Sequence, residues 1–317
     1  MKIVIIGGSG HIGTYLAPRL ARAGHEVSVV SRGLRSPYSP DPAWETVQFV
    51  TLDRKAEEAS GSFGAKVRDL QADAVVDLTC FTPESARQLV EALRGTLRLF
   101  VHCGTIWTHG YSTVVPTKEE TPRKPICEYG RRKLAIEQLL LEESAAGRLP
   151  AVVLHPGHIV GKGWNPLNPA GHFHPRVFSQ LARGEEVFLP NLGMETVHHV
   201  HADDVAQCFE SAISRPRQAA GESFHVVSER ALTLRGYAEA MAEWFGQPAR
   251  LRFLPWSEWK ATVSEGEAAY TWDHIAHSPN CSISKAQAGL NYSPRYSSLE
   301  AVQEAVQDLI ARRVIEV

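Results

Sequence analysis

Two side chains one helical turn apart, Tyr129 and Lys133, are the residues of this 317-residue chain best suited to acid–base chemistry. Residues four apart lie on the same face of a helix, so both can act on one substrate atom. An ammonium group next to a phenol favours the phenolate and lowers the pKa of the tyrosine. The spacing therefore predicts that Tyr129 acts as a general acid or base near neutral pH. The alternative is a tyrosine and a lysine exposed on a surface helix.

Thr105 supplies a hydroxyl close to this pair in the predicted fold. It follows the apolar stretch 97–102, which we interpret as a strand, and precedes the helix predicted over 128–146. Chemistry on nucleotide-binding sheets takes place beyond the strand ends, where this helix begins. We therefore expect Thr105 to hydrogen-bond a substrate oxygen alongside Tyr129. The alternative is a turn hydroxyl that bonds its own backbone.

The chain begins with an apolar stretch of strand length that leads into Gly7, Gly10 and Gly13, and a helical pattern follows. A strand, a glycine turn, a helix and a second strand together indicate a dinucleotide site. Gly7 permits a sharp turn, Gly10 leaves room for a pyrophosphate, and Gly13 lets the helix pack closely. The first helical residues, His11 and Ile12, offer unpaired N–H groups to the phosphates. The alternative is an ordinary tight turn.

The second strand ends in Ser31 and Arg32, where sites for NAD usually carry a carboxylate that binds the ribose hydroxyls. A hydroxyl and a guanidinium suit a ribose phosphate, because arginine binds phosphate through two parallel hydrogen bonds. The pair therefore favours NADP over NAD as the cofactor. The alternative is a solvated arginine at an NAD site that lacks its usual acid, so NAD stays open.

Strand and helix patterns alternate through the first half of the chain, and most strands are apolar throughout. Such strands are buried on both faces, so we predict an α/β fold with a Rossmann-type doubly wound parallel sheet. The second half is less regular, and the stretch 156–175 is rich in Pro, Gly, Asn and His. We expect a dinucleotide-binding domain over residues 1–155 that carries Tyr129 and Lys133. Residues 156–317 then form a smaller, mainly substrate-binding lobe, partly interleaved with the last strands of the sheet.

The composition is that of an ordinary globular chain, with 44% apolar and 21% charged residues and a formal net charge of -2. This charge provides no basic field, so we expect no nucleic-acid partner. No stretch reaches the roughly 18–20 apolar residues of a membrane span, so we expect no membrane association. The five cysteines are scattered and fit reduced thiols, and the cytoplasm is the expected compartment.

Together these motifs resemble the extended short-chain dehydrogenases/reductases, the superfamily of nucleotide-sugar epimerases, dehydratases and reductases. The resemblance rests on the glycine turn at residues 7–13 and on the pair Tyr129 and Lys133. Further matches span nearly the whole chain, such as His155-Pro156-Gly157, which resembles the family's Arg-Pro-Gly. The resemblance implies an NAD(P)-dependent oxidoreductase or epimerase that acts by hydride transfer on a hydroxyl or carbonyl of a sugar or nucleotide-sugar.

The resemblance also implies roles for single residues. Tyr129 exchanges a proton with the substrate. Lys133 lowers the pKa of Tyr129 and binds the nicotinamide ribose, and Thr105 orients the reacting oxygen. Asp53 resembles the family's adenine-contacting aspartate, with a strand-end cap as the alternative. The expected cofactor-binding residues are Gly7, Gly10, His11, Ile12, Gly13, Ser31, Arg32, Asp53, Lys133 and His155. Because members of the family are often dimers, the resemblance also implies a possible homodimer.

Two departures from the family pattern bear on the substrate. Nucleotide-sugar members usually grip the diphosphate with an arginine in the stretch that aligns with residues 195–199, which here contain none. A smaller sugar or another polyol is therefore open, and Arg176 and Arg183 are candidate replacements. Histidines also crowd the second half: His155, His158, His172, His174, His198, His199 and His201. No cysteine or acid completes a metal-ligand spacing among them, so we expect substrate contacts or structural roles and no metal.

A looser likeness of residues 76–83 to an atypical branch that includes chloroplast stem-loop RNA-binding proteins provides an alternative function. The chain is then a non-catalytic nucleotide-sensing or RNA-binding protein on the same fold. The net charge of -2 and the intact pair of Tyr129 and Lys133 argue against it. The pattern does not separate epimerase from reductase or dehydrogenase. Dehydration ranks lower, because residues 105–112 contain no acidic pair.

Overall fold

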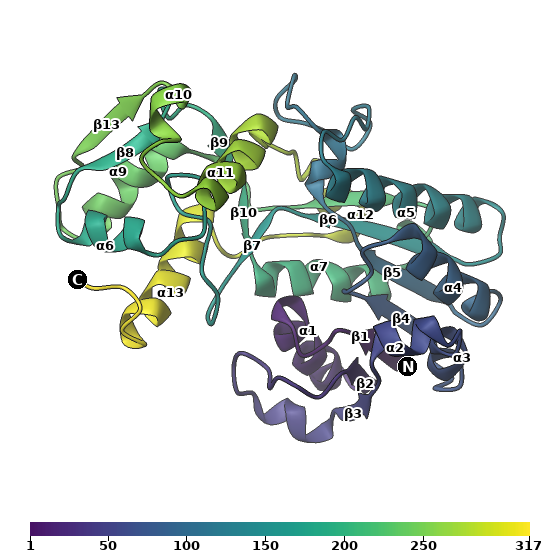
Figure 1. Ribbon diagram of the computed structural model, residues 1–317. Coiled ribbons are helices and arrows are strands. Elements are labelled where there is room, and N and C mark those ends of the chain that lie inside the picture. Colours follow the sequence, from purple (N-terminus) through teal and green to yellow (C-terminus); the bar gives the residue numbers. More distant parts are fainter.

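The computed structural model describes residues 1–317 and is built around a seven-stranded parallel sheet (Figure 1). The strand order is β11–β6–β5–β4–β1–β2–β3, and every neighbouring pair is parallel. The strands are β1 (Lys2–Ile6), β2 (Glu26–Ser31), β3 (Gln48–Thr51), β4 (Ala74–Asp77), β5 (Leu99–Cys103), β6 (Ala151–Pro156) and β11 (Ser223–Val226). The order reverses between β1 and β4, where ligands of such sheets bind beyond the carboxyl ends of the strands. The doubly wound α/β prediction is confirmed.

Helices cover both faces of this sheet, which explains why its strands are apolar without alternation. Successive strand residues point to opposite faces, so Ile3 and Ile5 pack in one core while Val4 and Ile6 pack in the other. The first core includes residues of α1 (His11–Arg22), α7 (Ala202–Ser214) and α12 (Ser284–Leu290). The second includes residues of α3 (Phe63–Arg68), α4 (Pro83–Leu93) and α5 (Glu128–Ala145). Between these elements lie η1 (Pro42–Thr46), α2 (Arg54–Ala59), η2 (Ile106–His109) and α8 (Pro216–Ala219).

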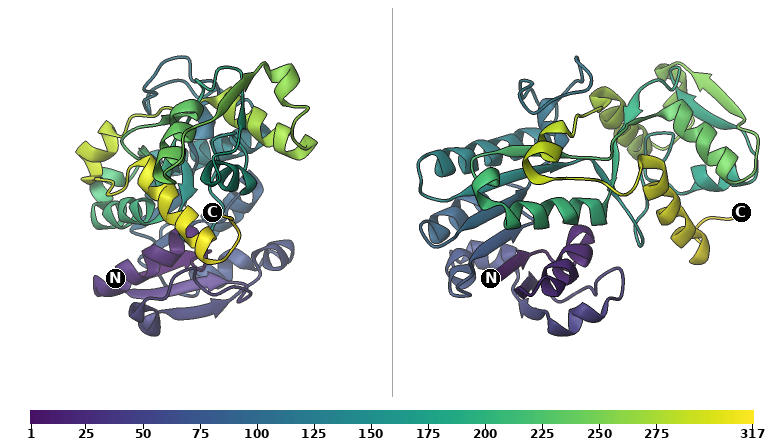
Figure 2. Two further views of the ribbon diagram at one scale, coloured as in Figure 1. Left: turned by 90° about the vertical axis from the view of Figure 1, so that its left-hand side faces the viewer. Right: turned by 180° about the vertical axis from the view of Figure 1, so that it is seen from behind.

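A smaller lobe with its own hydrophobic core stands at one end of the sheet (Figures 1 and 2). Three two-stranded ladders belong to this half of the chain, β7 with β10, β8 with β13 and β9 with β12. Their bounds are β7 (His158–Val160), β8 (Val187–Pro190), β9 (Thr196–Val197), β10 (His199–His201), β12 (Leu232–Thr233) and β13 (Leu251–Leu254). The helices are α6 (Arg176–Ala182), α9 (Leu234–Trp244), α10 (Trp256–Trp259), α11 (Glu265–His277) and α13 (Ser298–Ala311).

The two halves of the chain are interleaved in space. A division at residue 155 falls within β6, and β11 extends the central sheet beyond it. In Figure 2, α7 and α12 lie along the sheet although they come from the second half of the chain. The layer built on the central sheet therefore draws on residues 202–226 and 284–290 as well as on the first half. No helix combines the length and the apolar character that crossing a bilayer requires.

A buried carboxylate on α5 predicts a dependence of stability on pH. Glu143 is 3% exposed, and hydrogen bonds from Arg94 and Arg148 hold its pKa at about 2, below the ordinary 4.5. Between these two values the unfolded chain binds the extra proton, so the stabilisation is present above about pH 4.5 and is lost as pH falls towards 2. We expect the unfolding free energy from urea titrations to fall between about pH 5.5 and about pH 3.5. The variant Glu143→Gln should weaken that fall, and parallel pH profiles for variant and wild type would contradict the assignment.

Candidate active site

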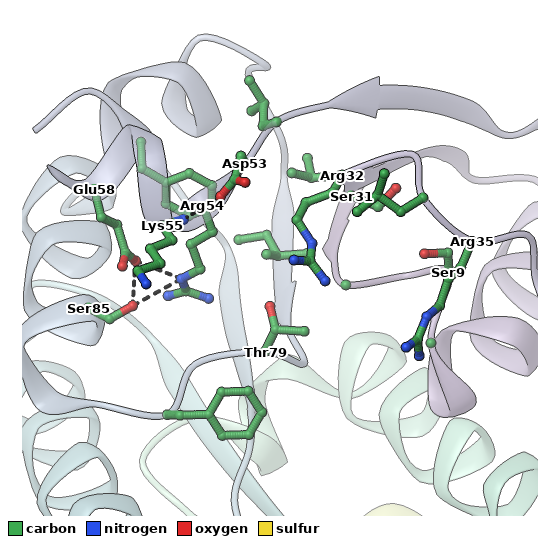
Figure 3. Close-up of a pocket in the computed structure, with 18 of the residues that line it drawn as sticks. Ser9, Ser31, Arg32, Arg35, Asp53, Arg54, Lys55, Glu58, Thr79 and Ser85 are labelled. Atoms are coloured by element: carbon green, nitrogen blue, oxygen red, sulfur yellow. Dashed lines mark hydrogen bonds and ion pairs between the residues drawn. The ribbon is translucent and has the colours of Figure 1, made fainter. Parts of the chain in front are cut away.

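A cavity of about 630 Å³ lies where β1, β2, β3 and β4 end (Figure 3). Five of the predicted cofactor-binding residues line it, namely Gly7, Gly10, Ser31, Arg32 and Asp53. Thr79 and Phe81, which follow β4, line it from the other side of the switch point. In Figure 3 the side chain of Arg32 extends from the end of β2 towards Thr79. The topology therefore gathers at one edge the residues that are far apart in the chain.

The glycine turn presents unpaired backbone amides to this edge. Gly7 has a φ of +83°, and a Cβ there would overlap the side chain of Thr79. A Cβ on Gly13 would overlap the backbone of Gly8, so this glycine lets the start of the helix lie close against the turn. The N–H groups of His11 and Ile12 donate to no protein acceptor, and the first turn of α1 carries no acid. An anion is the ligand that such a helix N-terminus favours.

His11 does not line the cavity. Its ring packs against Trp164 and Tyr38, and neither ring nitrogen has a hydrogen-bond partner. Burial, together with the nearby His201, lowers the pKa of His11 to about 2. The expected contribution of His11 to cofactor binding therefore narrows to its backbone N–H.

The cavity contains more basic residues than the sequence analysis identified. Arg35 and Lys55 line it as well as Arg32, and none of the three forms an ion pair. Arg35 makes only a long contact of 3.5 Å with the Tyr38 hydroxyl. Arg35 is only three residues after Arg32, so the sequence could have identified Arg35 as a cavity residue. Lys55 is distant from Arg32 in the chain, and only the fold brings it to the cavity. Three uncompensated cations suit a phosphate group.

Asp53 acts as the helix cap that the sequence left open, and its contact with an adenine stays a prediction. Its side chain lines the cavity, and its carboxylate caps α2 by accepting hydrogen bonds from the N–H groups of Lys55 and Ala56. The next residue, Arg54, is neutralised by Asp77 at 2.7 Å and by Glu58 at 2.6 Å. Arg54 is therefore a structural cation of the cavity floor.

Tyr129 and Lys133 lie on the first two turns of α5, as predicted, but they do not form a close pair. Lys133 is buried, and its Nζ donates to the carbonyl oxygens of Cys80 at 2.8 Å and Cys103 at 2.7 Å. It lies 5.9 Å from the centre of the Tyr129 ring. Burial lowers the pKa of Lys133. The ammonium is therefore directed to the ends of β4 and β5 and not to the phenol.

The prediction that Lys133 lowers the pKa of Tyr129 is wrong for this arrangement. The pKa of Tyr129 lies above its ordinary value because of burial, with a further increase from Cys103, and the Thr105 hydroxyl opposes both. Tyr129 is nevertheless 40% exposed, so its ring reaches solvent. The phenol is neutral near pH 7 and ready to donate a proton.

Thr105 lies next to Tyr129 and also caps the short helix η2. Its hydroxyl lies close enough to the Tyr129 phenol to lower the pKa of that group. The same oxygen accepts the N–H of Trp107 at 3.3 Å. The structural interpretation of Thr105 is therefore confirmed by the cap, and its catalytic role stays a prediction.

Trp107 connects Tyr129 to a group of imidazole rings. The Trp107 ring lies 6.1 Å from the Tyr129 ring, stacks on His277 at 4.2 Å and lies 5.3 Å from His274. His158 lies 4.9 Å from His274, and its ring nitrogens are buried without partners. His274 and His277 come from α11, which the sequence analysis did not predict, although Ser264 and Glu267 form a capping box at its start. That box was a readable signal.

The other predicted histidines divide between structural roles and the surface. His198 bonds the carbonyl of Ser228 and the N–H of Cys281, and His199 bonds the carbonyl of Leu167. His201 caps α7 through Nδ1. His172 is buried against Asn168, and His174 is exposed. Burial lowers the pKa of both His198 and His199, to about 4 and about 3, so their rings are neutral.

His155 does not line the cavity, although it was among the predicted cofactor-binding residues. It is fully buried in β6, and both of its ring nitrogens have protein partners. Nδ1 contacts the backbone of Thr105 and Nε2 contacts Glu137. No ring atom remains for a cofactor, so the structure assigns His155 to the support of Thr105.

Comparison with known proteins places these features in a family. 2'-Dehydrokanamycin reductase of Streptomyces kanamyceticus is 29% identical over 268 residues, which cover 84% of this chain and 72% of that protein. dTDP-6-deoxy-L-talose 4-dehydrogenase (NAD(P)(+)) of Kitasatospora kifunensis is 25% identical over 315 residues, 96% of this chain and 94% of that one. The crystal structure of UDP-glucuronic acid 4-epimerase from Bacillus cereus, with UDP-glucuronic acid and NAD, has the same fold. Its TM-score is 0.73 at 19% identity, over 98% of this chain and 100% of that one.

The sequence profile of one family covers most of the chain. It matches residues 3–226, which include the glycine turn, Thr105, Tyr129 and Lys133. The match supports a catalytic protein over the RNA-binding alternative, and it implies a nicotinamide cofactor. The chain belongs to the NAD dependent epimerase/dehydratase family.

Proposed function

We propose that the protein is an NADP(H)-dependent oxidoreductase that interconverts a hydroxyl and a carbonyl on a sugar-like substrate. The observation that carries the proposal is one sheet edge, where unpaired amides and cations line a cavity beside Tyr129 and Lys133. Phe81 joins the two parts, because it lines the cavity and its ring centre lies 4.9 Å from Lys133 Nζ. The protonated phenol of Tyr129 can donate the proton that reduction of a carbonyl to an alcohol requires.

The residues of the cavity fit a nicotinamide dinucleotide. The free amides of His11 and Ile12 suit the diphosphate, and Asp53 lies where an adenosine contact is expected. Bound there, the cofactor supplies the hydride donor or acceptor. NADP is favoured over NAD, because cations and a hydroxyl replace the carboxylate that usually ends the second strand. Lys133 holds the ends of β4 and β5 together beside the nicotinamide side of the site.

Tyr129 is the proton donor of the proposed reaction. A reduced carbonyl becomes an alkoxide unless a proton reaches its oxygen, and a positioned phenol delivers that proton. Thr105 shares the site and supplies a second hydroxyl for the same oxygen. In the reverse direction, the two hydroxyls accept the substrate hydrogen bond, and Tyr129 removes the proton.

The substrate side of the site favours an uncharged polyol. The ring cluster beside Tyr129 offers stacking faces from Trp107 and neutral imidazoles from His158 and His274. No lysine or arginine forms a hydrogen bond with the ring of His158 or His274, whose nearest recorded ring neighbours are other aromatic and imidazole side chains. These residues therefore provide no cation that would bind the diphosphate of a nucleotide-sugar. The two relatives divide on this point, one acting on dTDP-6-deoxy-L-talose and the other on 2'-dehydrokanamycin.

Removing the Arg32 guanidinium tests the choice of cofactor. A charged hydrogen bond contributes about 1.5–3 kcal/mol, so Arg32→Ala should raise the Kd for NADPH about tenfold or more and leave the Kd for NADH nearly unchanged. Fluorescence titration measures both constants. Arg98→Ala is the matched control, because Arg98 is an exposed arginine before β5, at the opposite end of the strands. Equal losses for NADPH and NADH would argue against phosphate recognition.

Epimerisation uses the same two half-reactions, so the nucleotide that the purified protein carries separates the two activities. An epimerase recycles its cofactor and retains it, whereas a reductase exchanges it at every turnover.

The homodimer that is usual in the family would form through α4 and α5, and it stays a prediction.

A further inference from the structure

A buried chain of hydrogen bonds connects the helix that carries Tyr129 to the turn that carries Thr105. Glu137 lies on α5, two turns after Tyr129 and one after Lys133, and its Oε1 is 3.0 Å from His155 Nε2. His155 Nδ1 then lies 3.0 Å from the N atom of Thr105 and 2.9 Å from its carbonyl oxygen. His155 is 0% exposed and Glu137 is 4% exposed. The chain of contacts is therefore short, desolvated and continuous.

A glycine makes room for this arrangement. A Cβ built on Gly104 would lie 2.5 Å from His155 Nδ1 and 2.7 Å from its Cε1. Real carbon atoms do not approach so closely, so any side chain at residue 104 would displace the imidazole. Gly104 stands where the family pattern has a serine, and His155 stands where it has an arginine. The two departures are therefore one structural change: the His155 ring occupies the space that a side chain at residue 104 would otherwise fill.

The carboxylate is itself held from the other side. Arg123 donates to both oxygens of Glu137, from Nε at 3.2 Å and from Nη2 at 2.9 Å, and it also donates to the Ser223 hydroxyl. Burial alone would raise the pKa of Glu137, but His155 and Arg123 hold it well below its ordinary value. The charge on Glu137 is therefore permanent at working pH. An ionised carboxylate at Nε2 orients the imidazole, as in other histidine–carboxylate pairs.

We propose that Glu137 and His155 are positioning residues, which hold the backbone of Thr105 so that its hydroxyl faces the Tyr129 phenol. The inference rests on the proposed function for its kinetic consequence. Thr105 follows a strand and Tyr129 lies at the start of a helix. The covalent chain between them does not by itself hold the Thr105 hydroxyl at a fixed distance from the Tyr129 phenol. Glu137 is rigidly linked to Tyr129 through two helical turns, so fixing Thr105 to Glu137 through His155 fixes it to Tyr129. Catalytic hydroxyls misplaced by about 1 Å lose about 10²-fold in rate.

A double-mutant cycle tests the proposal. His155→Ala is expected to lower kcat about 10- to 100-fold, with the KM of the substrate and the Kd for NADPH within about twofold of wild type. In a Thr105→Ala background the same substitution should change kcat less than about threefold, because its target is gone. Gly104→Ala should also lower kcat in wild type, and it should lower kcat less once His155 is alanine, because only the 2.8 Å contact of the new Cβ with Val153 Cγ1 then remains. Fully additive losses would overturn the proposal.

A spectroscopic readout keeps the test independent of turnover. The ¹³Cζ resonance of Tyr129, assigned by its absence in Tyr129→Phe, reports the polar surroundings of the phenol, to which the Thr105 hydroxyl contributes. We expect Thr105→Ala, His155→Ala and Glu137→Gln to shift it alike, and the combination of the first two to shift it no further. Glu143→Gln is the control, since it removes another buried, arginine-bound carboxylate from the same helix. An unmoved resonance in His155→Ala overturns the proposal even if no substrate is known. Turnover that survives Tyr129→Phe refutes the proposed function instead.

Discussion

Tyr129→Phe is expected to lower kcat by about 10²- to 10⁴-fold, the range that general acid–base groups contribute. The substitution removes one oxygen and keeps the ring that packs 6.1 Å from Trp107. The proton donor is lost, while the cavity that binds the cofactor is untouched, since Tyr129 does not line it. Steady-state kinetics with NADPH and a panel of sugar ketones measures the loss. Fluorescence titration should give a Kd for NADPH within about twofold of wild type.

A buried tyrosine elsewhere provides the control for this experiment. The Tyr237 hydroxyl donates to the carbonyl of Leu167 at 2.9 Å inside the second lobe. Tyr237→Phe should lower the unfolding free energy by about 0.5–1.5 kcal/mol and leave kcat unchanged. If Tyr129→Phe retains kcat, the acid–base role of Tyr129 is wrong. If both variants lose activity in proportion to stability, the effect on Tyr129 is structural.

Gly13→Ala is expected to abolish tight binding of the dinucleotide. The added methyl would overlap the carbonyl and Cα of Gly8, and backbone atoms cannot rotate away as a side chain does. The glycine turn must shift, and the amides of His11 and Ile12 shift with it. Each lost hydrogen bond to a charged phosphate costs about 1.5–3 kcal/mol, so the Kd for NADPH should rise at least about 10²-fold. Isothermal titration calorimetry measures this directly.

The same substitution at an open position separates this overlap from helix propensity. Gly266 lies in the first turn of α11, and a Cβ there meets no atom within 4 Å. Alanine stabilises a helix relative to glycine by up to about 1 kcal/mol, so Gly266→Ala should be neutral or mildly stabilising. Overpacking at Gly13 should instead lower the unfolding free energy by about 1–3 kcal/mol. Unchanged NADPH affinity in Gly13→Ala would show that the turn does not hold the diphosphate.

The first half of the fold was predictable because its signals are local. The strands β1 to β6 follow from apolar runs, and α4 follows from a capping threonine and a proline, with Thr82 accepting the N–H of Ser85. The second half was less readable. Its ladders contain two to four residues each, which is too short for a periodicity. The helix α11 was missed, and with it went His274 and His277 beside Trp107.

By itself, the sequence determined the chemistry that short spacing encodes. The glycine turn needs only strand, turn and helix in succession, and Tyr129 and Lys133 share a helix face because they are four residues apart. Ser31 and Arg32 likewise follow from the end of one strand. These features depend on backbone geometry within a dozen residues, which a sequence pattern contains in full.

Only the tertiary structure decided how these groups are used. It packed the His11 ring against Trp164 and Tyr38, brought Lys55 into the cavity lining, and directed Lys133 to two carbonyl oxygens instead of to Tyr129. It also placed His155 between Glu137 and Thr105. The contacts of Lys133 and His155 join segments tens of residues apart, and they arise because buried polar groups need partners. The spacing of residues along the chain does not encode which distant groups meet, so these contacts could be identified only from the tertiary structure.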